Sequence, residues 1–424
     1  MLNAVQKLTK PEQWSAFPRG ILAYGTAEAA TRAVRLVSIL IVARQISVEM
    51  LGASALALSL FEMIRVLTSV GIGQRLIAAH DEELAALCST AQRLFWMVCL
   101  GVMSIQLGAA GIAYGLFELP EVAAMLAVLA LVYPLMPAGL VHIFLAMRAQ
   151  RMAATARVVA SQNIADSTMT VLLVLVWPSA WALVLPKLLT APIWLVMARR
   201  TYAWKKAVGV TPAPVKEFAL FGPAVLGTEM LAAARLHGDK LLIGTLLGTE
   251  ALGIYFFAFN AGLGITQSLI AACNLVLFPQ LAKTPADKVD GEFRRAFVMG
   301  IGVLFPIVAA QALLAPLYVP VIFGSTWVEA SPFLALLACA ALPLFAGSML
   351  GARSRALGNP LGETALMSIA TMAALGGLSI GAHFSLEAAC FGYAAGLGAV
   401  LVGPTVIRFL PEQKQSLAPS KGEI

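Results

Sequence analysis

The chain has 424 residues, of which 60% are hydrophobic and only 12% are charged. Typical soluble domains have about 25% charged and 45–50% apolar residues, so this composition excludes a soluble enzyme, a disordered chain and a nucleic-acid-binding domain. The formal charge is +7, and its meaning depends on where the basic residues lie relative to the hydrophobic segments. Because about 20 apolar residues cross the hydrocarbon core of a bilayer, the length divides into membrane spans rather than soluble domains.

Hydrophobic segments recur along the whole chain and predict an all-α integral membrane protein with about 12 transmembrane helices. Helices are expected throughout because lipid cannot satisfy free backbone groups. Residues 1–16 are expected to form a cytoplasmic or interfacial segment, and residues 411–424 a cytoplasmic tail. The predicted spans are 17–43, 50–73, 92–116, 122–146, 153–176, 179–199, 218–247, 251–279, 296–318, 330–351, 361–382 and 386–409.

The basic residues predict the orientation of these spans. With the N-terminus inside, Arg44 is the one Lys or Arg of the 29 that falls in an outside loop; most of the others lie in cytoplasmic segments. The positive-inside rule therefore favours cytoplasmic N- and C-termini. The first residues lack a short apolar core that ends at a small-residue cleavage site, so the first span is expected to remain as an anchor.

The chain is predicted to form two six-helix lobes. Residues 17–200 and 217–410 are the expected lobes, joined by the basic cytoplasmic linker 201–216. Aligning their starts places Glu28 on Glu229, and an outer Glu-x-Leu-Gly turn recurs in both lobes at Glu49 and Glu250. Lobes with six spans each begin on the same side, so this repeat predicts a pseudo-two-fold axis along the membrane normal.

Short motifs carry a resemblance to a known family. In the second half these are Asp239-Lys240-Leu241-Leu242-Ile243-Gly244, Leu252-Gly253-Ile254-Tyr255 and Leu277-Phe278-Pro279; in the first they are Ala43-Arg44, Leu51-Gly52 and Gly71-Ile72-Gly73-Gln74. This pattern resembles Wzx-type flippases of lipid-linked oligosaccharides, in the multidrug/oligosaccharidyl-lipid/polysaccharide superfamily. The resemblance implies two lobes around a cavity that opens inward and then outward, in the bacterial inner membrane. It also implies transport of an oligosaccharide on undecaprenyl diphosphate, with membrane lipids and the polysaccharide polymerase and export machinery as partners.

Ionisable residues inside the predicted spans are expected to face a wet cavity or one another, because a charge at mid-bilayer costs at least about 2.5–3.5 kcal/mol. Guanidinium groups pair bidentately with phosphate and stay charged, which suits an anionic head group. The predicted anion-binding residues are Arg32, Arg35, Arg65, Arg235 and Lys187. The alternative is structural: Glu28–Arg32, Glu62–Arg65 and Arg235–Asp239 have helical spacing and could only neutralise each other.

Intramembrane carboxylates are candidates for coupling transport to protons or cations. Asp166 has no basic neighbour at helical spacing and is expected to be unpaired, as a coupling site or as a hydrogen-bonded contact between helices. Glu28, Glu62, Glu229 and Asp239 are further coupling candidates. Lys240 lies near the outer interface, where its ammonium group is expected to snorkel to water.

Two other functions stay open. One is a cation-coupled multidrug antiporter of the same superfamily, which should favour carboxylates; in the first two spans three arginines against two acids favour an anionic substrate instead. The other is a membrane-embedded polysaccharide-processing enzyme, which needs a catalytic constellation on an aqueous face. Short outside loops argue against such an enzyme. No cofactor or metal site is expected, and nucleic acid is not an expected partner.

Overall fold

The computed structural model describes residues 37–407 without 206–208, 210, 220–221, 265, 268, 272, 274–280, 282–283 and 286–287, and over these residues it contains helices and connecting loops but no strands. The chain divides after Ala233 into two compact units. Unit 1 ends at Ala233 and unit 2 begins at Ala234, and each is described by itself.

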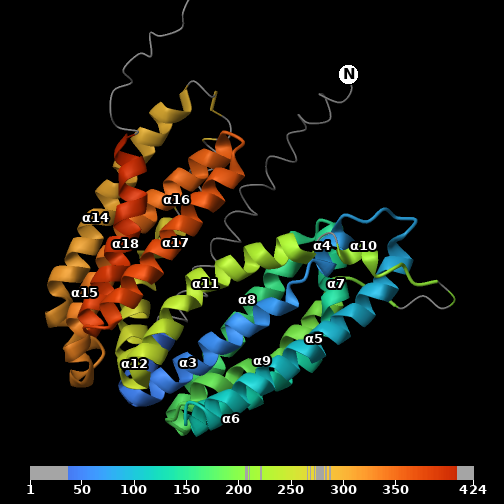
Figure 1. Cartoon of the computed structure of the whole chain (residues 1–424), viewed down its shortest axis with the longest axis horizontal. Helices are drawn as coiled ribbons and strands as arrows, with labels where there is room; N and C mark the ends of the chain where they lie inside the picture. Colours follow the sequence, from blue (N-terminus) through green and yellow to red (C-terminus); the bar gives the residue numbers. More distant parts are fainter. Residues whose placement is uncertain are drawn as a thin grey trace, which may run out of the picture. The chain divides into compact units, whose positions relative to one another are not determined.

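Unit 1 is a bundle in which α3, α5, α6 and α9 run side by side, with α4 and α10 at one end (Figure 1). Residues 37–45 are helical and precede α3. The other helices are α3 (Val48–Arg65), η1 (Val66–Thr68), α4 (Ile72–Ile77), α5 (Leu84–Gly115), α6 (Pro120–Leu129), η2 (Ala130–Leu135), α7 (Pro137–Arg148), α8 (Met152–Val176), α9 (Trp181–Thr201), α10 (Lys216–Ala219) and the first half of α11 (Gly222–Leu246).

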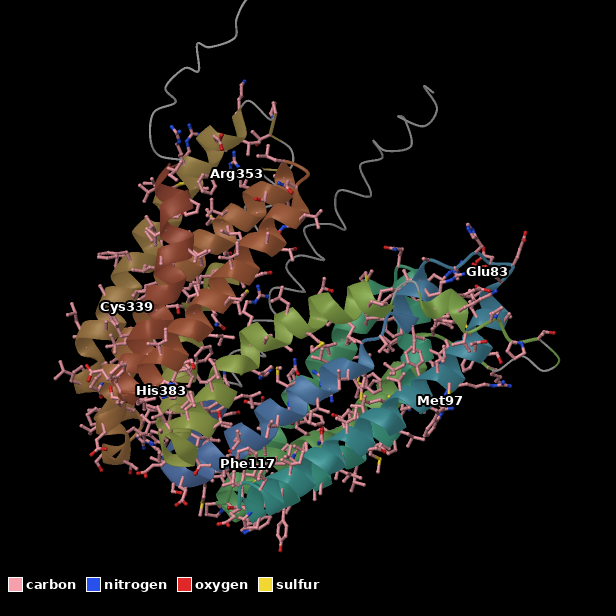
Figure 2. The ribbon with its side chains drawn as sticks, viewed as in Figure 1. Glu83, Met97, Phe117, Cys339, Arg353 and His383 are labelled. Carbon is pink, nitrogen blue, oxygen red and sulfur yellow. The ribbon has the colours of Figure 1, made fainter. Side chains whose placement is uncertain are left out.

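Unit 2 contains the rest of α11 and a bundle around the tightly packed pair α17 and α18. Arg353 and His383 mark its two ends in Figure 2. Its helices are α12 (Gly248–Ala258), the π-helical turn η3 (Phe259–Leu263), α14 (Val289–Ile322), η5 (Ser325–Ala330), α15 (Ser331–Cys339), α16 (Ala341–Ala356), α17 (Pro360–Ala382) and α18 (Leu386–Ile407).

Within the described ranges, 8 helical segments are long and apolar enough to cross a membrane, or up to 9 if the bent pair α6–η2 and α7 is one span. They coincide with predicted spans from both halves of the chain. The helix breaks at the prolines of the predicted fourth span: Pro134 lies in η2, Pro137 begins α7, and the two parts are bent by 55°. The count of about 12 and the two six-helix lobes stay predictions, because most of the predicted first span lies outside the described residues.

Many of these helices expose apolar side chains outward. On α14, Leu313 is 77% exposed, Leu317 67% and Val321 73%. A soluble protein rarely presents a continuous apolar surface of this kind, whereas lipid covers it without cost. With 32 residues, α5 is about 48 Å long, which exceeds the hydrocarbon core of about 30 Å. Glu83 and Phe117 lie at its opposite ends, and Met97 lies between them (Figure 2). The chain is therefore a multi-pass membrane protein.

The repeated Glu-x-Leu-Gly turn forms the same local structure in both units. Glu49 lies in the first turn of α3 and Glu250 in the first turn of α12, where a carboxylate interacts favourably with the helix dipole. The leucine that follows each one, Leu51 or Leu252, is buried. The proposed internal repeat thus corresponds to equivalent helix starts in these two places.

The α17–α18 contact depends on glycines that allow the two backbones to touch. A Cβ atom on Gly392 would collide with the backbone of Gly377, and one on Gly377 would collide with Gly392. Small residues at such positions let membrane helices approach closely enough for dispersion to hold them together.

We expect Gly392→Ala to destabilise the protein by about 1–3 kcal/mol, because the added methyl group must push the two backbones apart. Gly398→Ala on the same helix is the matched control, since a Cβ there meets nothing within 4 Å. Thermal unfolding in detergent should show a lower midpoint for the first variant only. Equal midpoints for the two variants would contradict this packing.

Candidate functional site

Unit 1 contains a cavity of about 410 Å³. Its walls come from α3, η1, α4, α5, η2, α7, α8 and α9, so helices far apart in the sequence contribute to one site. Four aromatic rings form much of the apolar wall. They are Phe61, Phe95, Phe144 and Trp194.

One wall is a break in a helix. The helix that begins as α3 ends with η1 at Thr68, and α4 starts again only at Ile72. Gly71, directly before α4, has a φ of +74°, a left-handed conformation that glycine adopts without steric cost. Residues 68–74 line the cavity as a result.

Two ion pairs face this cavity. Arg65 donates through Nε to Glu62 Oε2 at 2.8 Å, within α3. Lys187 on α9 donates through Nζ to Asp166 Oδ2 at 2.9 Å, across to α8. The described cavity wall therefore carries two cations and two carboxylates, and their charges cancel. The Glu62–Arg65 pair, which the sequence offered as the structural alternative, is thus present.

The expectation that Asp166 is unpaired was wrong. Its partner, Lys187, lies on the neighbouring helix, 21 residues further along the chain, where helical spacing cannot reveal it. The other carboxylate oxygen, Oδ1, is buried and has no hydrogen-bond partner in the described part of the protein. Asp166 thus keeps one unused acceptor at the cavity.

Three amide side chains also line the cavity: Gln74, Gln162 and Asn163. Within the described ranges none of these amides is hydrogen-bonded by another protein group. No motif or spacing in the sequence marked these amides or Trp194 as site residues. The glutamine in the motif Gly71-Ile72-Gly73-Gln74 was the one signal that could have identified Gln74.

A second charged cluster is buried in unit 2. Asp239 is 0% exposed and accepts from Lys240 Nζ at 3.0 Å and from the Tyr255 hydroxyl at 2.8 Å. Lys240 also donates to the Leu236 carbonyl at 2.9 Å, and its ammonium lies 3.9 Å from the centre of the Phe259 ring. These contacts join α11 to α12 and to the π-helical turn η3.

This cluster corrects two expectations. Lys240 does not snorkel to an interface, because the carboxylate, the carbonyl and the aromatic ring satisfy its charge inside the protein. Asp239 pairs with Lys240 rather than with Arg235. The family-like motif Asp239-Lys240 and the later Tyr255 are thus parts of one hydrogen-bonded unit.

The other predicted site residues fall in different places. Arg235 lines a small pocket of about 20 Å³ in unit 2, beside Tyr393. Glu229 is exposed on α11. Glu28, Arg32 and Arg35 lie outside the described residues.

Ionic contacts hold one end of unit 1 together, next to the broken helix. Arg75 on α4 donates to Glu83 Oε1 at 3.0 Å and to Glu217 Oε2 on α10 at 3.0 Å. The hydrogen bond from Arg75 lowers the pKa of Glu83 below its usual value. Glu83 lies at this end of the bundle in Figure 2. This network was not predicted from the sequence. It connects the cavity wall to the segment after the predicted linker.

Long apolar helices around a polar, charge-balanced cavity define a multi-pass membrane protein of the transporter class. Residues 41–332 match the model of the family described as "Polysaccharide biosynthesis protein". The chain belongs to this family.

Curated relatives carry related names. The chain is 25% identical over 315 residues to the succinoglycan biosynthesis transport protein ExoT of Rhizobium meliloti (strain 1021), covering 73% of this chain and 63% of the relative. It is 23% identical over 342 residues to the lipopolysaccharide biosynthesis protein WzxC of Escherichia coli (strain K12). This match covers 77% of this chain and 65% of the relative. The matches thus span less than two thirds of these relatives' lengths.

Solved structures share the fold. The lipid II flippase MurJ in an inward closed conformation aligns with a TM-score of 0.75 at 10% identity, over 92% of this chain and 87% of that one. An inward-facing multidrug resistance MATE transporter of the MOP superfamily aligns with a TM-score of 0.64 at 13% identity. The alignment covers 89% of this chain and 94% of that one. These likenesses establish the fold, which is common to proteins with different named substrates.

Replacing Asp239 with Asn should lower the free energy of unfolding by about 3–5 kcal/mol, because the Lys240 ammonium would stay buried without its counter-ion. The double variant Asp239→Asn/Lys240→Met should recover much of the loss. Glu229→Gln, an exposed change on the same helix, is the control. Thermal or denaturant unfolding in detergent measures these differences. An Asp239→Asn variant with the free energy of unfolding of the wild type would show that Asp239 and Lys240 are not a coupled pair.

The Arg75–Glu83 contact should make stability depend on pH. Because the pKa of Glu83 is lowered in the folded protein, its stabilising effect is complete above the ordinary value of 4.5 and is lost as the pH falls through the folded value. The melting temperature of the wild type should therefore exceed that of Glu83→Gln at pH 6–8, and the gap should close below about pH 4.5. Glu82→Gln, an exposed neighbour, should show no such gap, and a gap for Glu83→Gln that is independent of pH would contradict the ionic contact.

Proposed function

We propose that the protein flips an oligosaccharide linked to undecaprenyl diphosphate across the bacterial inner membrane, for exopolysaccharide or O-antigen synthesis. Family membership, the names of the relatives and a polar cavity inside a transporter fold support this proposal. The two ion pairs in the cavity lining carry it furthest, because their cations, Arg65 and Lys187, have the charge that a phosphate head group needs.

In this proposal the diphosphate enters the cavity from the cytoplasmic side and the prenyl chain stays in lipid. Arg65 and Lys187 then exchange their carboxylate partners for phosphate oxygens, which form charge-assisted hydrogen bonds of similar geometry. Arg65 is half exposed and Lys187 partly exposed, so both are accessible to a ligand. Arg32, Arg35 and Arg235 remain proposed further contacts for the anion.

Alternating access would move the head group outward. We propose about 12 spans in two six-helix lobes that rock against each other, with both termini in the cytoplasm. Basic residues from several helices gather at one end of unit 1, as the positive-inside rule expects of a cytoplasmic face: Arg148 contacts Asp81, Arg151 bonds the Thr201 carbonyl, and Arg75 contacts Glu217. The polysaccharide polymerase and export machinery are proposed downstream partners.

A cation-coupled multidrug antiporter is the second candidate. The observation in its favour is that carboxylates equal cations on the described cavity wall, so the excess of arginine in the sequence does not extend to this site. In that case Asp166 or Glu62 would bind the proton, the ion or a cationic drug, with Glu28, Glu229 and Asp239 as further coupling candidates.

Two double variants separate these functions. If the substrate is a diphosphate, Arg65→Ala/Lys187→Ala should reduce export by more than about tenfold, because each charge-assisted hydrogen bond contributes about 1.5–3 kcal/mol. Glu62→Gln/Asp166→Asn keeps both cations and should retain head-group binding. The measurements are polysaccharide export and undecaprenyl-linked repeat units on the inner leaflet of a strain that lacks the wild-type chain.

The opposite result would support the antiporter. Resistance to cationic drugs that is lost in Glu62→Gln/Asp166→Asn, together with normal export in Arg65→Ala/Lys187→Ala, would overturn the flippase proposal. Immunoblots of the membrane fraction control for the abundance of each variant.

A further inference from the structure

The cavity of unit 1 is lined by charged groups, by amides and by the hydroxyl residues Thr68 and Ser69. The charged groups, Glu62, Arg65, Asp166 and Lys187, already bond to one another. The amides of Gln74, Gln162 and Asn163 have no protein hydrogen-bond partner in the described ranges. The hydrogen-bonding capacity left over in this cavity is therefore mostly neutral, and a neutral ligand group would use it.

We propose that these amides and Trp194 form a subsite for the sugar joined directly to the diphosphate. This inference rests on the proposed function and adds a location and a recognition chemistry to it. An amide offers two donors and a carbonyl acceptor, which match the hydroxyl or acetamido groups of a pyranose. An aromatic ring offers an apolar face for the C–H groups of the same sugar, while its polar neighbours orient the ligand.

The order of residues along α8 supports this location. Gln162 and Asn163 precede Asp166 by four and three residues, so they share its side of the helix, about one turn or 5.4 Å away. A pyranose ring has about this length. A diphosphate at the Lys187–Asp166 pair would thus place its first sugar beside the two amides.

The facing helix α9 has the complementary order. Lys187, Ala191 and Trp194 all line the cavity and follow one another at helical spacing. Trp194 therefore lies about 10 Å from the cation along the helix axis, and the small side chain of Ala191 leaves room between them. Gln74 reaches the same cavity from the first turn of α4, directly after the break in the helix.

A cationic drug would make little use of this arrangement. Such a ligand needs the carboxylates, whereas three neutral amides at the cavity favour a ligand with many hydroxyl groups. The specificity of the site for its glycan would then depend on the amides, and its affinity for the lipid carrier on the cations.

Binding of two lipids to the purified full-length protein tests this division. The probes are undecaprenyl diphosphate and the same lipid with a single glucose or galactose, and native mass spectrometry or thermophoresis in detergent gives each Kd. In the wild type we expect at least one sugar-bearing lipid to bind about tenfold more tightly than the bare lipid, as a few neutral hydrogen bonds allow. In Gln162→Ala/Asn163→Ala the ratio should fall to about one, with binding of the bare lipid unchanged.

Gln45→Ala, an exposed amide away from the cavity, is the matched control and should keep the wild-type ratio. An unchanged thermal midpoint shows that the double variant is folded. Equal binding of bare and sugar-bearing lipids by the wild type, or a sugar preference that survives in the double variant, would overturn the subsite while leaving the flippase proposal intact. Failure of the wild type to bind either lipid would overturn both.

Discussion

Charge inside a membrane is the constraint on which the rest of this structure depends. Hydrocarbon cannot solvate an ion, so each ionised side chain within a span needs a counter-ion, a carbonyl or a wet cavity. The two units meet this constraint differently. In unit 1 the pairs Glu62–Arg65 and Asp166–Lys187 stay partly exposed on a cavity wall, whereas in unit 2 Asp239 and Lys240 are enclosed by Tyr255 and Phe259.

This difference bears on function. A partly exposed ion pair can exchange one partner for a ligand without leaving a bare charge in the protein, and so the cavity of unit 1 suits an anionic head group. A fully buried pair cannot exchange a partner for a ligand so easily, because separating it would leave an uncompensated charge inside the protein. The cluster of unit 2 therefore stabilises the contact of α11 with α12 and η3, even though its residues belong to the motif that carries the family resemblance.

The broken helix connects the cavity to the surface of unit 1. Gly71 permits the turn between η1 and α4, which turns residues 68–74 toward the cavity. A few residues later, Arg75 bonds to Glu83 and to Glu217 on α10. The cavity wall is thus anchored at the end of the bundle where the basic residues gather, close to the segment that links the halves of the sequence.

Local spacing predicted only part of the site. Glu62 and Arg65 lie three residues apart on one helix, and their pairing follows from helix geometry alone. The bond between Asp166 and Lys187 depends on how α8 packs against α9, and the burial of Lys240 depends on where Tyr255 and Phe259 lie. Neither arrangement is encoded at helical spacing, which explains why the sequence suggested an unpaired Asp166 and a snorkelling Lys240.

By itself, the sequence determined that this is a helical membrane protein. It also determined most of the spans in the described ranges and the family. These features follow from hydropathy, backbone chemistry and short motifs, all of which act locally along the chain. Only the tertiary structure decided which charges meet, which amides are left without partners, and that one cavity gathers both. Side chains on different helices come together through packing, and the spacing of residues within a single helix does not predict which of them meet.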